Sequence, residues 1–286
     1  MLRAIALSAL SLVAACGPAA TPTGATSAPA TSLPAASSAA SAPASALGGE
    51  LDRIRARGTL IVAIRVEAPP ANRTMGDPAH TQKRAFETAI ATLIATAIIG
   101  PGARVQLQST GGDRLLALGQ GADLAMVTES PTSRDRALIS PPYAANSVVL
   151  AIKAGASIAR VEDLVAKSVG VAQDELVTRD LAQMFFQLRA VAVTLDTYMG
   201  VNGAASALEG DKAAAFVGDG IGVALLAAER GLKILTEITP RPYVVAVRQN
   251  APDLANAVNA ALRDALSSGA VRDAAAKASF PYVAPR

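Results

Sequence analysis

Apolar runs of strand length alternate with helical segments along most of this chain. Runs of this kind are typical of strands buried on both faces. The chain has about as many helical segments as strands, and these helices can cover those faces. The alternation therefore predicts an α/β fold with mainly parallel sheets. The expected strands are 59–65, 104–108, 122–127, 147–153, 168–172, 191–195, 213–217, 232–238 and 243–248. The expected helices are 51–57, 83–99, 113–118, 160–166, 175–188, 202–209, 221–230, 252–267 and 270–278.

The N-terminus has a different pattern. A positive charge at Arg3 precedes an apolar run, 4–14, which is too short to cross a bilayer as a helix. The run ends in Val13-Ala14-Ala15-Cys16, and Cys16 is the only cysteine. These four residues resemble the lipobox of bacterial lipoproteins, in which the signal peptide is cut before a cysteine that carries a diacylglycerol. The resemblance implies a signal peptide over 1–15 and a lipid on Cys16; the alternative is an ordinary secretory signal with an incidental cysteine.

The segment 16–46 is rich in Ala, Pro, Ser and Thr. After Cys16 it holds no charge and one large apolar residue, Leu33, so it cannot bury a core of its own. We expect a disordered linker between a lipid anchor and a folded part that begins near residue 48. The protein is then expected outside the cytoplasm, anchored to a bacterial membrane through its lipid.

Composition argues against several classes of function. One histidine and one cysteine give poor support to a metal site or to a Ser-His-Asp or Cys-His mechanism, so we expect no cofactor, no metal and no catalytic residue. The net charge is +3, and the basic residues form no dense cluster. We therefore expect no nucleic-acid partner.

Five motifs, in order, are similar to those of the family 3 solute-binding proteins, the polar amino-acid receptors of ABC importers. The resemblance covers roughly residues 48–283. The motifs are LDRIRARGTLIVAIRVEAPP (51–70), GGDRLLALGQGADLAMV (111–127), TSRDRALISPPY (132–143), EGDKAAAFVGDGIGVALLA (209–227) and PYVVAVRQNAPDLANAVNAALRDALSSGAVRD (242–273).

The resemblance implies a two-lobed fold of the type II periplasmic-binding-protein kind, with two hinge crossovers. Lobe one would comprise 48–143 plus 244–286, and lobe two would comprise 144–243. Tyr143 and Tyr243 would lie near the crossings. The expected partners are a small-molecule solute held between the lobes and the membrane subunits of an ABC importer, and the protein is expected to be a monomer.

The turn TESPTSRDR (128–136) supplies hydroxyls and arginines for a solute's carboxylate. Its candidates are Thr128, Ser130, Ser133, Arg134 and Arg136, and it follows an expected strand, where α/β folds place ligands. Arginine suits a carboxylate because its planar fork donates two parallel hydrogen bonds. The motif Asp-Arg-Ala favours Arg136 as the family's ligand arginine, whereas the spacing to the neighbouring motifs slightly favours Arg134. Both could instead be surface arginines.

Asp219 is the candidate for a solute's amino group. It follows an expected strand and precedes a helix, so it could equally be that helix's N-cap. Two departures from the family pattern concern the pocket. No aromatic residue follows VEAPP, and Gln173-Asp174-Glu175 replaces a usual Gly-Thr. These acids could meet a cationic solute or start a helix, and we favour the helix start.

The leading functional hypothesis is a lipid-anchored receptor that captures an amino acid or a related carboxylate for an ABC importer. A second is an enzyme, because the family includes dehydratases of arogenate and prephenate; Glu129, Asp174 and Glu175 are its possible general acids. A third is a ligand-poor relative that serves as an accessory or sensory partner of another secreted protein.

Overall fold

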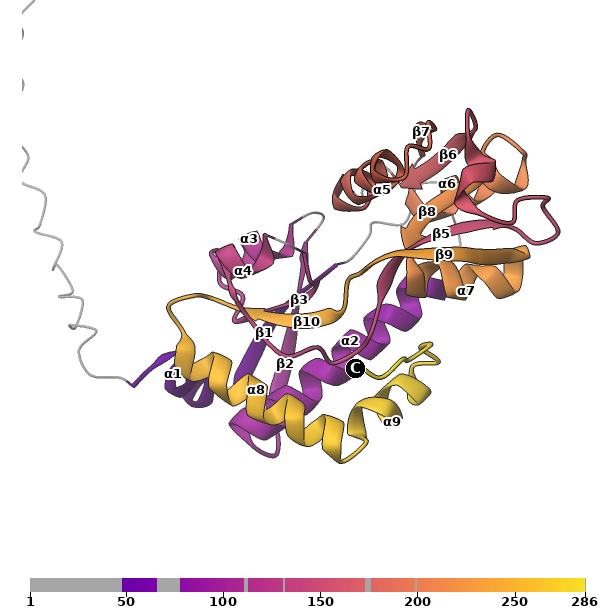
Figure 1. Cartoon of the computed structure of the whole chain (residues 1–286). Coiled ribbons are helices and arrows are strands. Elements are labelled where there is room, and N and C mark those ends of the chain that lie inside the picture. Colours follow the sequence, from indigo (N-terminus) through magenta and orange to yellow (C-terminus); the bar gives the residue numbers. More distant parts are fainter. Residues whose placement is uncertain are drawn as a thin grey trace, which may run out of the picture. The chain divides into compact units, whose positions relative to one another are not determined.

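A computed structural model describes residues 48–65, 78–110, 113–130, 132–172, 176–198 and 200–285. All of them belong to one compact unit, Ser45–Arg286. The predicted signal peptide, Cys16 and the linker 16–46 lie outside the described residues. The described part forms two α/β lobes, each built on a five-stranded sheet with helices packed on it (Figure 1). The predicted two-lobed fold class is confirmed.

The first lobe contains strands from both ends of the described chain. Its sheet has the order β2-β1-β3-β10-β4. The strands are β1 (Thr59–Arg65), β2 (Arg104–Thr110), β3 (Leu124–Thr128), β4 (Leu138–Ile139) and β10 (Tyr243–Val247). The helices are α1 (Glu50–Arg57), α2 (Pro78–Ile99), α3 (Arg114–Leu118), α4 (Ser133–Arg136), α8 (Pro252–Ser267) and α9 (Ala270–Lys277).

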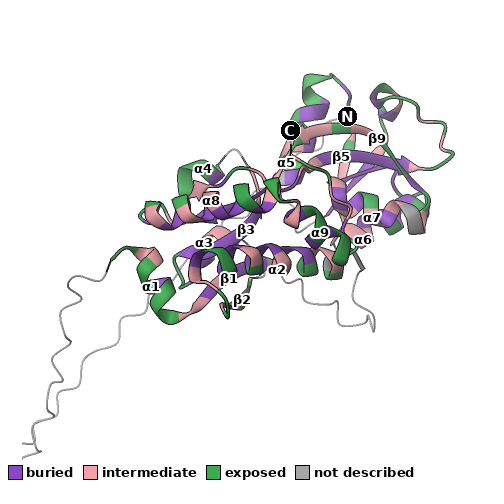
Figure 2. Ribbon diagram, turned by 90° about the horizontal axis from the view of Figure 1, so that it is seen from below, coloured by how far each residue is buried: buried purple, intermediate pink, exposed green. Residues whose placement is uncertain are grey.

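Side chains alternate across this sheet, as the twofold period of a strand requires. Val62, Met126 and Val245 point to one face, where α2, α8 and α9 bury them. Ala125 and Val244 point to the other face, toward α3. Burial on both faces explains why these strands are apolar throughout (Figure 2).

The second lobe is built in the same way from the middle of the chain. Its sheet has the order β7-β6-β8-β5-β9, with α5 packed on one face and α6 and α7 on the other. The strands are β5 (Ser147–Lys153), β6 (Ser168–Ala172), β7 (Thr194–Tyr198), β8 (Ala215–Asp219) and β9 (Leu232–Pro240). The helices are the 3-10 turn η1 (Val161–Leu164), α5 (Leu176–Leu188), α6 (Gly200–Glu209) and α7 (Gly220–Arg230).

Both sheets are mixed, and the predicted mainly parallel arrangement holds except at two strands. β1 is parallel to β2 and β3, and β6 is parallel to β7 and β8, but β5 and β10 are antiparallel to their neighbours. Each of these two strands begins directly after a crossover between the lobes. The chain enters each sheet beside the last residues of the neighbouring strand, β3 for β10 and β8 for β5. The entering strand must therefore run antiparallel to that neighbour.

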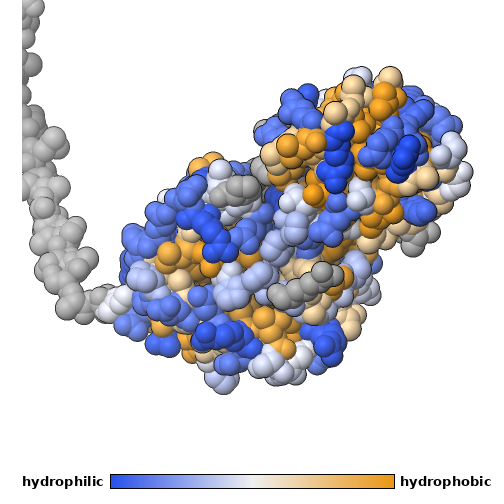
Figure 3. All heavy atoms as spheres, viewed as in Figure 1, coloured by the Kyte–Doolittle hydropathy of each residue, from blue (hydrophilic) through white to orange (hydrophobic). Residues whose placement is uncertain are grey.

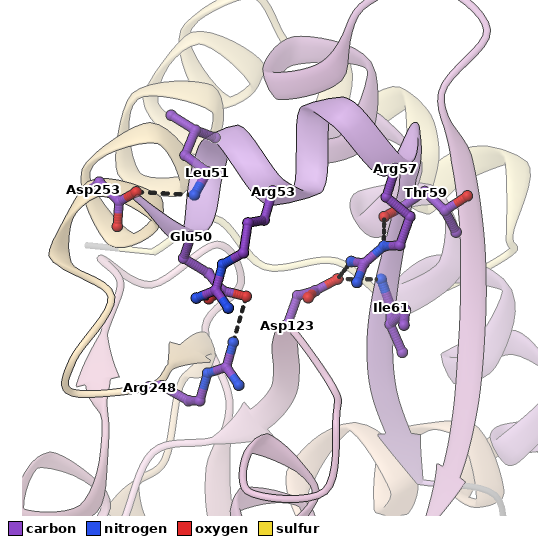
Figure 4. A network of polar contacts seen from close by, with 9 residues as sticks. All are labelled: Glu50, Leu51, Arg53, Arg57, Thr59, Ile61, Asp123, Arg248 and Asp253. Atoms are coloured by element: carbon purple, nitrogen blue, oxygen red, sulfur yellow. Dashed lines mark hydrogen bonds and ion pairs between the residues drawn. The ribbon is translucent and has the colours of Figure 1, made fainter. Parts of the chain in front are cut away.

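The first helix is held to the first lobe at both of its ends (Figure 4). At its start, the backbone N–H of Leu51 donates to Asp253 Oδ2 at 2.9 Å, and Glu50 pairs with Arg53 and Arg248. At its end, Arg57 pairs with the buried Asp123, which also accepts the N–H of Ile61 at 2.7 Å. Gly58 ends the helix in the left-handed conformation that favours glycine.

The surface of the described part mixes polar and apolar side chains. On the face drawn in Figure 3, hydrophilic and hydrophobic residues are interspersed over both lobes. The large apolar side chains that remain exposed are dispersed through the sequence: Leu116, Val165, Met184, Leu188, Ile234 and Val283. A surface of this kind is ordinary for a globular protein. None of the described helices is both long and apolar enough to cross a membrane.

Candidate functional site at the lobe junction

The two crossovers between the lobes run side by side. The first joins β4 to β5 and the second joins β9 to β10. The N–H of Tyr143 donates to the carbonyl of Tyr243 at 3.0 Å, and the N–H of Tyr243 donates to the carbonyl of Ala144 at 2.9 Å. Both tyrosines are fully buried, with ring centroids 6.1 Å apart. The crossovers are thus hydrogen-bonded to each other where they leave the first lobe.

The C-terminal tail and α7 reinforce this junction. Phe280 stacks on Phe86 of α2 with ring centroids 4.2 Å apart, and the carbonyl of Val283 accepts the N–H of Ala145 at 2.8 Å. Ile221, in the first turn of α7, is buried in the apolar core of the first lobe. Elements from both lobes therefore position the side chains that lie around the crossovers.

Asp219 ends β8 and caps α7. Its Oδ1 accepts the N–H of Gly222 at 3.1 Å, which satisfies one of the donors left open at a helix start. Its Oδ2 accepts from the side-chain amide of Asn146, on the first crossover, at 2.8 Å. The hydroxyl of Tyr243 lies 3.5 Å from Oδ1. The helix-cap alternative for Asp219 is thus observed, while its role toward a solute's amino group stays a prediction.

Arg241, on the second crossover, reaches both lobes. Its Nη2 donates to Thr128 Oγ1 at 2.8 Å and its Nε to the carbonyl of Glu129 at 3.3 Å, both at the end of β3. Its Nη1 donates to the hydroxyl of Thr178 on α5 at 3.2 Å. Its own carbonyl accepts from Asn146 at 3.0 Å. Arg241 and Asn146 therefore connect Thr128 of the first lobe with Asp219 of the second.

The remaining candidates of the 128–136 turn bond mainly within lobe one. Ser133 is buried, and its hydroxyl lies 2.8 Å from that of Ser130 and accepts the N–H of Ser130. The guanidinium of Arg134 pairs with Glu129 at 2.7 Å. Arg136 pairs with Asp113, which also caps α3.

Arg134 borders a depression on the outside of this turn. The depression has a volume of about 380 Å³ and lies between the α4–β4 segment and α8. Its lining is formed by Arg134, Ala137, Leu138, Ile139, Pro252, Ala255, Asn256 and Asn259. Within the described residues, neither Arg134 nor Arg136 bonds to Asp219. The structure thus brings Thr128 and Asp219 into one network and gives both predicted arginines carboxylate partners of their own chain.

Burial changes the acid–base properties of the two crossover tyrosines. It raises the pKa of Tyr143 well above its ordinary value, and the nearby negative charge of Glu87 adds to the rise. Burial likewise raises the pKa of Tyr243, with a further contribution from Asp219. Both hydroxyls therefore stay protonated at neutral pH. Tyr143 Oη is buried and has no hydrogen-bond partner among the described residues.

Part of the predicted pocket lies outside the described residues: Asp174, Glu175 and the segment that follows VEAPP. Within the described ranges, no three His, Cys, Asp or Glu side chains are placed to hold a metal ion together. The sequence reasoning missed Arg241, Asn146 and Thr178. One signal was present for Arg241, because it stands between Pro240 and Pro242 immediately before a predicted strand, where a side chain is held by stiff backbone.

No model of a known protein family matches the chain. Its fold is similar to those of solved amino-acid-binding proteins, at identities that show the fold alone. An ArgBP variant from T. maritima is 20% identical with a TM-score of 0.60, and the match covers 79% of this chain and 97% of that one. A substrate-binding protein of an amino acid ABC transporter from Streptococcus pneumoniae, bound to L-arginine, is 19% identical with a TM-score of 0.62, covering 82% and 100%.

A third similar structure is an ancestral amino acid-binding protein described as a precursor of cyclohexadienyl dehydratase. It is 23% identical with a TM-score of 0.61, and the match covers 80% of this chain and 99% of that one. The structural neighbours are thus mainly amino-acid-binding proteins, several of them from ABC transporters. The class that these structures define for this chain is one of fold alone, the two-lobed α/β fold of amino-acid-binding proteins.

Proposed function

We propose that this protein is an extracytoplasmic solute-binding protein, anchored to a bacterial membrane through a lipid on Cys16. It captures an amino acid or a related carboxylate between lobe one (48–143 plus 244–286) and lobe two (144–243). As a monomer, it delivers this solute to the membrane subunits of an ABC importer. Residues 1–15 are the signal peptide, and 16–46 are the tether that lets the lobes reach the importer.

The observation that carries the proposal is the convergence of polar side chains from both lobes on the crossovers. A solute that contacts both lobes favours the closed state by the difference of its affinities for the two states. Thr128 and Asp219, predicted to face the solute, belong to one hydrogen-bonded network across the junction. Arg134 and Arg136 stay candidates for binding the solute's carboxylate. To bind it, Arg134 would have to leave Glu129, and Arg136 would have to leave Asp113.

The test begins with native mass spectrometry of the full-length protein purified in detergent, to detect a co-purified solute. Calorimetry with the twenty amino acids then follows, after bound solute is removed by unfolding and refolding. We expect Arg134→Ala combined with Arg136→Ala to abolish binding without changing the melting temperature by more than a few degrees. Arg104→Ala is the matched control, because this exposed arginine begins the edge strand β2, at the end of the first sheet away from Thr128. Unchanged affinity in the double variant would reject these arginines as ligands.

A second candidate function is supported by one of the structural neighbours, the ancestral precursor of cyclohexadienyl dehydratase. A dehydratase needs a placed general acid, for which Glu129 is the one described candidate. In the structure its carboxylate is paired with Arg134 at 2.7 Å, and this pair would have to separate before Glu129 could meet a substrate. Incubation with prephenate and arogenate, followed by chromatography of the products, separates the two functions. Failure to bind any small solute, together with a co-purifying protein, would instead favour an accessory or sensory role.

A further inference from the structure

The side-chain amide of Asn146 is held by three partners at the lobe junction. Its Nδ2 donates to Asp219 Oδ2 at 2.8 Å and to the carbonyl of Arg241 at 3.0 Å, and its Oδ1 accepts the N–H of Ile221 at 3.3 Å. An amide nitrogen carries two N–H groups, so both donors are used. A reversed amide would turn its oxygen toward two other acceptors, so these partners allow one orientation only.

The backbone of Asn146 is held as well. Its carbonyl accepts the N–H of Arg241 at 2.8 Å, so its backbone and its side chain both join the first crossover to the second. The chain then enters β5 at the next residue, and Val148 of that strand lies opposite Asp219 of β8. The amide that reaches Asp219 therefore starts from a backbone fixed on both sides.

The carboxylate of Asp219 keeps room for another partner. A carboxylate offers about four lone pairs, and here Oδ1 accepts from Gly222 and Oδ2 accepts from Asn146. The hydroxyl of Tyr243 is a more distant neighbour, 3.5 Å from Oδ1. Asp219 is only partly buried. A solute's ammonium group can therefore add a contact without displacing the existing ones.

The contact with Asn146 decides how this carboxylate is oriented. Two hydrogen bonds on different oxygens fix the plane of a carboxylate, whereas the contact with Gly222 alone would let the group rotate about its bond to Cβ. A charged group is effective toward a partner only when it is held in the geometry that the partner needs.

We propose that Asn146 is a positioning residue, which sets the orientation in which Asp219 presents its carboxylate to a solute's amino group. This inference rests on the proposed function and adds a residue to its site. Asn146 acts through Asp219 and does not itself need to touch the solute. Because it also joins the two crossovers, the contact of a solute with Asp219 is linked to the hinge between the lobes.

Calorimetry on the full-length protein, freed of bound solute, tests this role with two probes. The first is the amino acid, among the twenty, that the wild type binds most tightly. The second is the carboxylate that lacks its amino group, such as propanoate for L-alanine, glutarate for L-glutamate or 5-guanidinopentanoate for L-arginine. The ratio of the two affinities isolates the contribution of the amino group.

We expect Asn146→Ala to lower this ratio at least about tenfold, because the hydrogen bond that it removes is made to a charged group. The affinity for the amine-free carboxylate should change by less than about threefold. Asn250→Ala is the matched control, because this exposed asparagine lies in the turn that follows β10, at the other end of that strand from Tyr243. Its ratio should match that of the wild type.

A double-variant cycle tests whether Asn146 acts through Asp219. Asp219→Asn already removes the acceptor of the Asn146 amide, because an amide nitrogen cannot accept a hydrogen bond. Adding Asn146→Ala to Asp219→Asn should therefore lower the ratio by less than about a further twofold.

The outcomes separate this inference from the proposed function. A purely structural role would weaken both probes equally in Asn146→Ala, and that result, or a further tenfold loss in the double variant, overturns the inference while solute binding stands. If the wild type binds none of the twenty amino acids, both are overturned. If Asn146→Ala fails to fold, NMR of the wild type decides. The side-chain amide protons of Asn146 should shift with the amino acid and not with the amine-free carboxylate, and equal shifts with both, or none with either, overturn the inference.

Discussion

Substitutions at Asp219 separate its structural role from its predicted role toward a solute. Its Oδ1 caps α7 through Gly222 at 3.1 Å, and its Oδ2 accepts from Asn146 at 2.8 Å. Asparagine is as good an N-cap as aspartate but carries no charge. Asp219→Asn therefore keeps the cap and removes the charge, whereas Asp219→Ala removes both.

The magnitudes follow from these contacts. Loss of an N-cap costs about 0.5–2 kcal/mol. Loss of the hydrogen bond from Asn146 costs about 1 kcal/mol, because its amide keeps the carbonyl of Arg241 as a second acceptor. We expect Asp219→Ala to lower the free energy of unfolding by about 1.5–3 kcal/mol, which for a unit of this size lowers the melting temperature by about 3–12 °C. Asp219→Asn should lose about 1 kcal/mol, since its amide oxygen keeps the cap while its amide nitrogen cannot accept from Asn146.

Urea unfolding and calorimetry together test this reasoning. Asp219→Asn should fold nearly as well as the wild type, yet bind amino acids at least about tenfold more weakly, because an ammonium group loses its charged partner. A carboxylate without an amino group should bind both proteins equally. Wild-type affinity for amino acids in Asp219→Asn would refute the ammonium role. Wild-type stability in Asp219→Ala would refute the assignment of stability to the cap and the Asn146 contact.

Three further predictions concern the anchor, the hinge and the first lobe. Cys16→Ser should move the protein from the membrane fraction to the soluble fraction, as shown by fractionation and immunoblotting; retention in the membrane would contradict lipidation. Tyr143→Phe should not destabilise the protein at pH 7, because its buried hydroxyl has no partner among the described residues. The raised pKa of Tyr143 keeps it protonated in the folded state, while the unfolded state ionises above about pH 10, so the wild type should lose about 1.4 kcal/mol more per pH unit there than Tyr143→Phe. Urea unfolding at pH 9 and pH 11 measures this loss. If the free energy of unfolding falls equally between these pH values in the wild type and in Tyr143→Phe, the prediction is wrong. Asp123→Ala should cost about 1–3 kcal/mol in urea unfolding, because it leaves the N–H of Ile61 without its acceptor.

The elements of the fold could be predicted closely because their signals are local. The run TLIVAIR forms β1 over Thr59–Arg65 as expected, and the helix expected over 252–267 is α8 with the same bounds. Where the sequence pattern is weak, the observed bounds of an element differ from the predicted ones. The strand expected over 191–195 lies instead at Thr194–Tyr198, because Val191 turns into the core after Ala190, and the strand is a partly exposed sheet edge. Strand direction is not local, which is why the sequence did not indicate that β5 and β10 run antiparallel to their neighbours.

The candidate site was predicted only in part, for the same physical reason. Thr128 and Asp219 could be proposed because each follows a buried strand, and strand ends are where α/β folds place functional side chains. Their connection through Arg241 and Asn146 depends on contacts between residues 63 to 113 positions apart. No periodicity encodes such contacts.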